Sequence, residues 1–160
     1  MAKSRSALFP ILLTAFVVTI IDGSDAVIYT MFRGVPGERV FQFIASVVIG
    51  KKAYELAPWS TMLGILMHCG VALTLTAIYF ALAGLIEKLT MNWFVSGALY
   101  GLVTWILINQ VLFVWVGIKS SYTALAPWPG LLNGVGAHVF FVGTPIAFGA
   151  ARHRKRAGKR

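Results

Sequence analysis

Four polar side chains lie within long apolar stretches of this sequence: Asp22, His68, Asn109 and His138. In a membrane interior, a polar or ionisable group that faces lipid costs a few kcal/mol, so such groups turn inward and often mark functional sites. Histidine titrates near neutral pH and is the commonest metal ligand. The four residues therefore form the candidate site, with Asp22, His68 and His138 as the candidate proton-relay groups or metal ligands.

The two histidines follow similar motifs. Ala-Pro-Trp ends at Trp59 and is followed by Leu-Gly-x-x-x-His68; Ala-Pro-Trp ends again at Trp128 and is followed by Leu-Asn-Gly-x-x-x-His138. At 1.5 Å per helical residue, each histidine lies about 15–16 Å from its proline, near the midplane of a bilayer. We interpret the pattern as a diverged parallel repeat of two hairpins. Coincidence is the alternative, because Pro-Trp is common at membrane interfaces.

Three hypotheses cover this polar cluster. The commonplace one, which we favour, is that the groups hydrogen-bond across helices and determine which helix packs on which. The second is a proton or cation site formed by Asp22, His68 and His138. The third is haem ligation by the two histidines, with Gly64 and Gly134 leaving room for the ring.

The remaining reactive side chains do not suggest catalysis. Asp25 shares a helix face with Asp22 but lies nearer the expected outer surface, where we expect it to be hydrated. Cys69 points about 100° away from His68, which indicates packing, and a single cysteine excludes a disulfide framework. Glu38 and Glu55 have basic neighbours, which is typical of solvated loop charges. We expect no enzymatic activity and no cofactor.

The elements that must hold these residues follow from composition. The chain has 160 residues, of which 58% are hydrophobic and only 12% charged, about half the charge of an ordinary soluble domain. About 20 apolar residues cross a bilayer. Four stretches qualify, at about 7–32, 58–86, 93–116 and 131–151, and a shorter one at about 38–50 does not. Tryptophans stand at the ends of the spans, as an aromatic belt requires: Trp59, Trp93, Trp115 and Trp128.

The predicted fold is an all-α membrane protein. It comprises a four-transmembrane-helix bundle, which can be divided into tandem helical hairpins, and one short interfacial or re-entrant helix. This single domain covers residues 1–151, and residues 152–160 form a basic tail. The short helix carries Gln42 and Ser46 on one side and apolar residues on the other, so Gln42 is its candidate polar site residue.

Charge orients the bundle. The chain has 14 Lys and Arg against 5 Asp and Glu, a net charge of +9. The side that holds both termini carries more basic residues, so the positive-inside rule predicts cytoplasmic termini. The tail is expected to contact anionic lipid rather than nucleic acid. A cleaved secretory signal ending near residue 26 is the alternative that we disfavour, because apolar sequence resumes there.

Several motifs resemble an uncharacterised family of small bacterial inner-membrane proteins with four predicted spans. They are Arg-Gly-Val-Pro-x-Glu-Arg at 33–39, Gln-x-x-Ala-Ser-x-x-x-Gly at 42–50, and Leu-Asn-Gly-x-x-x-His-x-x-x-Val-Gly-x-Pro-Ile-Ala at 132–147. The resemblance implies polar site positions at Asp22, Gln42, His68, Asn109 and His138. It implies no biochemical activity. The segment 51–58 departs from the family pattern, which puts any role of that loop in doubt.

The predicted function is that of an integral cytoplasmic-membrane protein, a non-enzymatic module that binds a partner or associates with the envelope. The alternative is a small proton or divalent-metal carrier or sensor that uses the midplane cluster of Asp22, His68 and His138. Four spans are few for a lone transporter, so that role would require a homo-oligomer. The expected partner in either case is the lipid bilayer.

Overall fold

The computed structural model describes residues 6–117 and 128–158, and within those ranges every regular element is a helix. Four helices are long and apolar enough to cross a membrane, which confirms the predicted all-α class and its four long apolar segments. These are α1 (Leu8–Phe32), α3 (Trp59–Leu85), the composite helix Trp93–Trp115 and the composite helix Trp128–Ala157. Tryptophan begins or ends three of the four, at the positions that the aromatic-belt argument predicts.

Both composite helices contain a π-helical segment. The third span consists of α5 (Trp93–Trp105), the π segment η2 (Ile106–Leu112) and α6 (Phe113–Trp115). The fourth consists of α7 (Trp128–Ala137), the π segment η3 (His138–Gly143) and α8 (Thr144–Ala157). Such segments are rare and occur mostly as local bulges, frequently at functional sites. Asn109 lies within η2 and His138 begins η3.

Three short elements connect the spans. Helix α2 (Glu38–Ile49) occupies the segment where the sequence predicts a short helix, with Glu38 in its first turn. It ends where Gly50 takes a positive φ of 62°, a backbone conformation that residues other than glycine rarely adopt. The sequence did not predict the 3₁₀ turn η1 (Gly50–Tyr54) that follows, nor the single helical turn α4 (Lys88–Met91) between the second and third spans.

The fourth span is longer than predicted. The expected range was 131–151, whereas the helix runs from Trp128 to Ala157 and so includes most of the stretch assigned to a separate tail. The prediction counted consecutive apolar residues, so it ended the span just before the first charged residue, Arg152. Arginine, lysine and alanine are nevertheless good helix formers, and basic side chains near a helix C-terminus interact favourably with its dipole.

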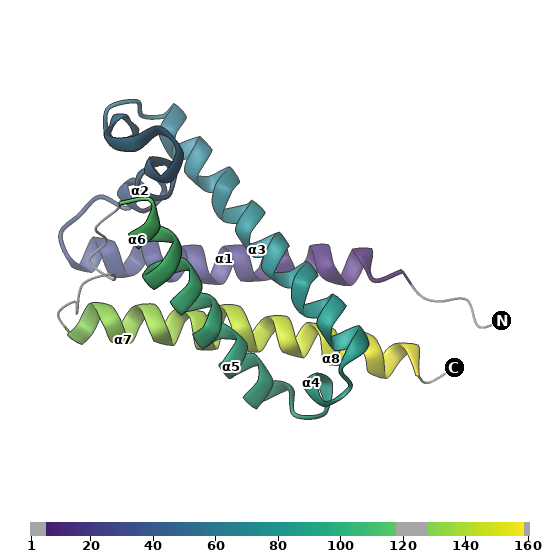
Figure 1. Ribbon diagram of the computed structural model, residues 1–160. Coiled ribbons are helices and arrows are strands. Elements are labelled where there is room, and N and C mark those ends of the chain that lie inside the picture. The colour runs from purple at the N-terminus through teal and green to yellow at the C-terminus, as the bar shows by residue number, and fades with distance from the viewer. Residues whose placement is uncertain (1–5, 118–127, 159–160) are drawn as a thin grey trace.

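This fourth span is the central element. Figure 1 shows α1 and α7–α8 side by side, with the start of α1, the end of α8 and the turn α4 at one end of the molecule and α2 at the other. Helix α8 contacts α1, α3, α4 and α5. The buried core gathers along it, where Ile146 and Ala147 pack with Val18 of α1 and Tyr79 of α3. The start of α1 and the end of α8 therefore lie on the same side of the structure.

Glycines bring the third and fourth spans into backbone contact. A Cβ added at Gly101 would overlap the carbonyl of His138, and one at Gly143 would overlap the carbonyl of Gly97. A Cβ at Gly97 would lie 2.7 Å from the Cα of Thr144. Small residues four apart allow this approach between apolar helices, where no hydrophobic drive brings them together. The small-xxx-small pair at positions 97 and 101 thus sets the position of η3, and with it that of His138.

Tyrosine hydroxyls add directional contacts between the second and third spans. The Tyr100 hydroxyl donates to the Leu75 carbonyl at 2.8 Å, and the rings of Tyr79 and Tyr100 meet edge to face with centroids 4.9 Å apart. We expect Tyr100→Phe to lower the free energy of unfolding in detergent by about 0.6 to 2 kcal/mol, the range for such bonds between membrane helices. Tyr54→Phe is the control, because Tyr54 is exposed. Equal losses in the two variants would contradict a role for this hydrogen bond.

Candidate functional site

The polar residues of the spans meet at one cavity. It has a volume of about 210 Å³ and is lined by α1, α2, α3 and both composite helices. All four residues of the predicted site line it: Asp22, His68, Asn109 and His138. The rest of the wall is largely apolar. A small cavity with a few convergent polar groups in an apolar wall is the usual form of a binding site.

Asp22 and His68 approach each other in the cavity wall. The Nε2 atom of His68 lies 4.0 Å from an Asp22 carboxylate oxygen and 3.2 Å from the Thr19 carbonyl oxygen one turn earlier on α1. A carbonyl only accepts, so Nε2 carries a proton and donates it to Thr19. Gly23 makes room for the ring, since a Cβ there would lie 3.2 Å from Nε2. Asp22 is therefore placed to compensate a positive charge on His68.

His138 donates its hydrogen bond from the other ring nitrogen, Nδ1, whereas His68 donates from Nε2. Its Nδ1 atom lies 3.0 Å from the Gly134 carbonyl of its own helix, so Nδ1 is the donor. In the neutral ring Nε2 is then the basic nitrogen. The repeat analysis predicted two histidines at one depth, and the structure brings both to the same cavity.

Two further residues of the cavity were underestimated from the sequence. Asn133 of α7 donates through Nδ2 to an Asp25 carboxylate oxygen of α1 at 3.0 Å, and both residues line the cavity. The sequence placed Asp25 nearer the outer surface than Asp22, and the structure shows it partly buried and hydrogen-bonded to the fourth span. The three-residue spacing from Asp22 was the signal available, since it places both carboxylates on one helix face.

A third missed residue is Trp105, which lines the cavity from the third span. Its side chain is 7% exposed, and the indole N–H is buried without a hydrogen-bond partner among the described residues. One turn later Asn109 donates through Nδ2 to the Trp105 carbonyl at 3.2 Å. An unpaired buried donor is costly and rare. No sequence pattern indicated this buried, unpaired donor beside the cavity.

Gln42 lies apart from this cluster. It accepts a hydrogen bond from Arg39 at 3.0 Å and donates one to the Thr61 hydroxyl at 3.4 Å, so it joins α2 to the start of α3. The polar side of α2 is thus buried against α3, where a Cβ at Gly64 would overlap the Phe41 carbonyl. The apolar side contributes Phe41 and Ile44 to the cavity wall. Helix α2 therefore covers one side of the cavity, and Gln42 helps hold it there.

Two of the ligand hypotheses can be compared with this geometry. The haem hypothesis needs open space at Gly64, but the backbone of Phe41 fills that space. Within residues 6–117 and 128–158, no group of three or more His, Cys, Asp or Glu side chains lies close enough to hold a metal ion. Part of the second repeat motif, at residues 126 and 127, lies outside the described residues.

Together these features define an all-helical chain with four helices apolar enough to span a membrane and an Asp/His cavity among them. Comparisons with known protein families, with curated proteins and with solved structures found no match for this chain.

Proposed function

We propose that this chain is an integral membrane protein of the bacterial cytoplasmic membrane, with its four long helices forming a transmembrane bundle. Hydropathy and the tryptophans at the helix ends support the spans. The start of α1 and the end of α8 lie at one end, and the basic side chains of α8 gather there, which supports cytoplasmic termini. Helix α2 is then an outer-face helix at the opposite end, covering the cavity.

Within that bundle, we propose that the cavity binds and releases protons, so that the protein acts as a small proton carrier or sensor. The observation that carries the proposal is the 4.0 Å approach of Asp22 and His68 on a cavity that they share with His138. Ionisable groups inside spans are costly to maintain, and chains of Asp, Glu and His form proton relays in membrane proteins. As a carrier the chain would act as a homo-oligomer, because one four-helix bundle is small for transport.

The chemistry follows from the two rings. A second proton on His68, taken up at Nδ1, leaves its donation to Thr19 intact and places a positive charge beside the Asp22 carboxylate. A second proton on His138 is taken up at Nε2, because Nδ1 already donates to Gly134. Asp25 is engaged by Asn133, which leaves Asp22 as the counter-charge.

The test compares histidine variants in lipid vesicles. In vesicles that contain a trapped pH-sensitive dye and carry a potassium diffusion potential, we expect the wild-type chain to acidify the interior. We expect His68→Gln together with His138→Gln to reduce the flux to that of empty vesicles. His153→Gln is the matched control, since this third histidine lies outside the cavity, and it should retain the flux.

A sensor would give a different signal from the same variants. Hydrogen exchange in α2 should differ between about pH 5.5 and 7.5 in the wild-type chain and become independent of pH in the double variant, because the titrating groups of the cavity wall are lost. If the wild-type chain shows neither proton flux nor pH-dependent exchange, the proton site is wrong.

The second candidate is a non-enzymatic module that binds a protein partner or associates with the envelope. It is favoured by the hydrogen bond from His68 to the Thr19 carbonyl, which joins α3 to α1. His138 and Asn109 bond to carbonyls of their own helices, Gly134 and Trp105. In that case the polar groups mainly stabilise the bundle. The double histidine variant would then lower the thermal stability equally at all pH values and leave no functional pH signal.

A further inference from the structure

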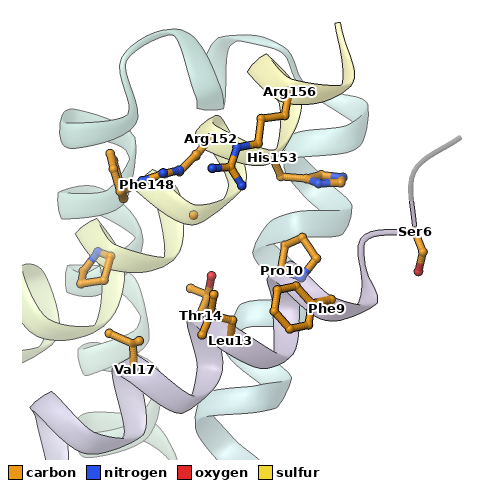
Figure 2. Close-up of a pocket in the computed structure, with 12 residues that line it drawn as sticks. Ser6, Phe9, Pro10, Leu13, Thr14, Val17, Phe148, Arg152, His153 and Arg156 are labelled. Atoms are coloured by element: carbon orange, nitrogen blue, oxygen red, sulfur yellow. The ribbon is translucent and has the colours of Figure 1, made fainter. Parts of the chain in front are cut away.

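A second hollow lies at the opposite end from α2, between α1 and α8. This α1–α8 groove has a volume of about 680 Å³ and is lined only by residues from Ser6 to Val17 and from Pro145 to Arg156. Figure 2 shows its two walls, with Phe9, Pro10 and Leu13 on α1 and with Arg152, His153 and Arg156 on α8. The two helices are held close where a Cβ at Gly149 would meet the Thr14 hydroxyl.

The groove is apolar along its length and basic at one end. Phe9, Leu13 and Val17 recur every four residues, so they form one stripe of α1, and each is 42% exposed or more. On α8, Phe148, Arg152 and Arg156 are also four residues apart, so they too form one stripe of their helix. Because α1 and α8 run in opposite directions, Val17 and Phe148 lie deeper along the helices, whereas Phe9 and the arginines lie toward the start of α1 and the end of α8.

Charge in the groove is unbalanced. Its lining includes two arginines and His153 but no acidic side chain. Arg152 and Arg156 are both exposed. By contrast, Arg154 between them on the helix donates to the Ala83 carbonyl near the end of α3 at 2.7 Å, so it is committed to a helix terminus. At the end of α8, Arg154 is therefore hydrogen-bonded to α3, whereas Arg152 and Arg156 present their positive charges to the groove.

We propose that the α1–α8 groove binds one anionic phospholipid. Arg152 and Arg156 hold the phosphate, which guanidinium groups recognise through paired donors. An acyl chain lies along Phe9, Leu13 and Phe148. A zwitterionic lipid compensates its own phosphate with an amine, so the uncompensated charge of the groove selects a headgroup with net negative charge. Basic pockets between membrane helices on the cytoplasmic side bind anionic headgroups in this way. The proposal depends on the membrane location alone and is independent of the proton site.

The experiment measures lipid retention on the full chain in detergent by native mass spectrometry, with phosphatidylglycerol or phosphatidylethanolamine added. We expect one tightly held phosphatidylglycerol and clear preference over phosphatidylethanolamine. Arg152→Gln and Arg156→Gln should each weaken binding about fivefold, the effect of one basic residue near an anionic lipid. Combining Arg152→Gln with Arg156→Gln removes two charges from the groove. The matched control is Lys88→Gln with Lys155→Gln, which removes the same charge from exposed positions outside the groove and should retain the lipid.

Three outcomes would overturn the proposal. One is equal loss of phosphatidylglycerol in the arginine and lysine double variants, which would indicate general charge attraction. Another is displacement by soluble glycerol phosphate at concentrations similar to the lipid, since the apolar stripe would then contribute nothing. The third is a dimer without bound lipid that dissociates in the arginine variant, which would make a second copy of the chain the occupant.

Discussion

Gly101→Leu is expected to destabilise the contact between the third and fourth spans strongly. A Cβ at position 101 would overlap the His138 carbonyl, which is backbone and cannot turn aside as a flexible side chain can. The third and fourth spans must then separate. Because overpacking of a side chain already costs about 1 to 3 kcal/mol, we expect a loss of at least about 3 kcal/mol in unfolding free energy, measured by thermal or denaturant unfolding in detergent.

The same substitution at Gly136 is the control. Gly136 lies in α7, and nothing stands within 4 Å of a Cβ placed there. We expect Gly136→Leu to be neutral or to stabilise the helix by up to about 1 kcal/mol, the cost of glycine in a helix interior. Should Gly101→Leu fail to fold, Gly101→Ala provides the graded measurement. A Gly101→Ala protein as stable as the wild type would contradict the close backbone contact.

Gly64→Val is expected to detach α2 from the bundle and expose the cavity. The Phe41 backbone occupies the space that a side chain at position 64 needs. The hydrogen bond from Gln42 to Thr61, at 3.4 Å, is too weak to hold α2 once this contact is lost. We expect hydrogen exchange of residues 38–49 to rise by at least about tenfold, which corresponds to a loss of about 1.4 kcal/mol of local stability.

Gly70→Val on the same helix is the matched control, because a Cβ there meets nothing within 4 Å. It should leave exchange in α2 unchanged. The exchange of α7 and α8 should also stay unchanged in Gly64→Val, since neither contains the altered contact. Equal exchange of α2 in the two glycine variants would show that α2 is held by something other than its backbone contact with α3.

The long helices could be predicted from the sequence because the physics is local. Apolar runs of about 20 residues satisfy their backbone hydrogen bonds internally only as helices when they lie in lipid. The predicted range 58–86 differs by one residue at each end from α3, Trp59–Leu85. The polar residues could be predicted as a set for the same reason, since each stands out in apolar sequence. Membership in a family of small bacterial inner-membrane proteins stays a prediction.

The partners of those residues could not be predicted, because they depend on how each helix is rotated and on which span covers it. Asp25 was expected to be hydrated, yet Asn133 from a segment 108 residues away donates to it. Gln42 was grouped with the site residues, yet it joins α2 to α3. Mean hydropathy cannot predict such contacts, because it averages over a whole helix and does not say which face a residue occupies.

By itself, then, the sequence determined that this chain forms four long apolar helices and that its acidic and imidazole groups inside them are few. Only the tertiary structure decided that Asp22, His68 and His138 share a cavity with Trp105, and that Arg152 and Arg156 face a groove while Arg154 fastens α3. The physical reason is the glycine contacts at positions 64, 97, 101 and 143. They set the helix separations, and those separations select which polar side chains meet.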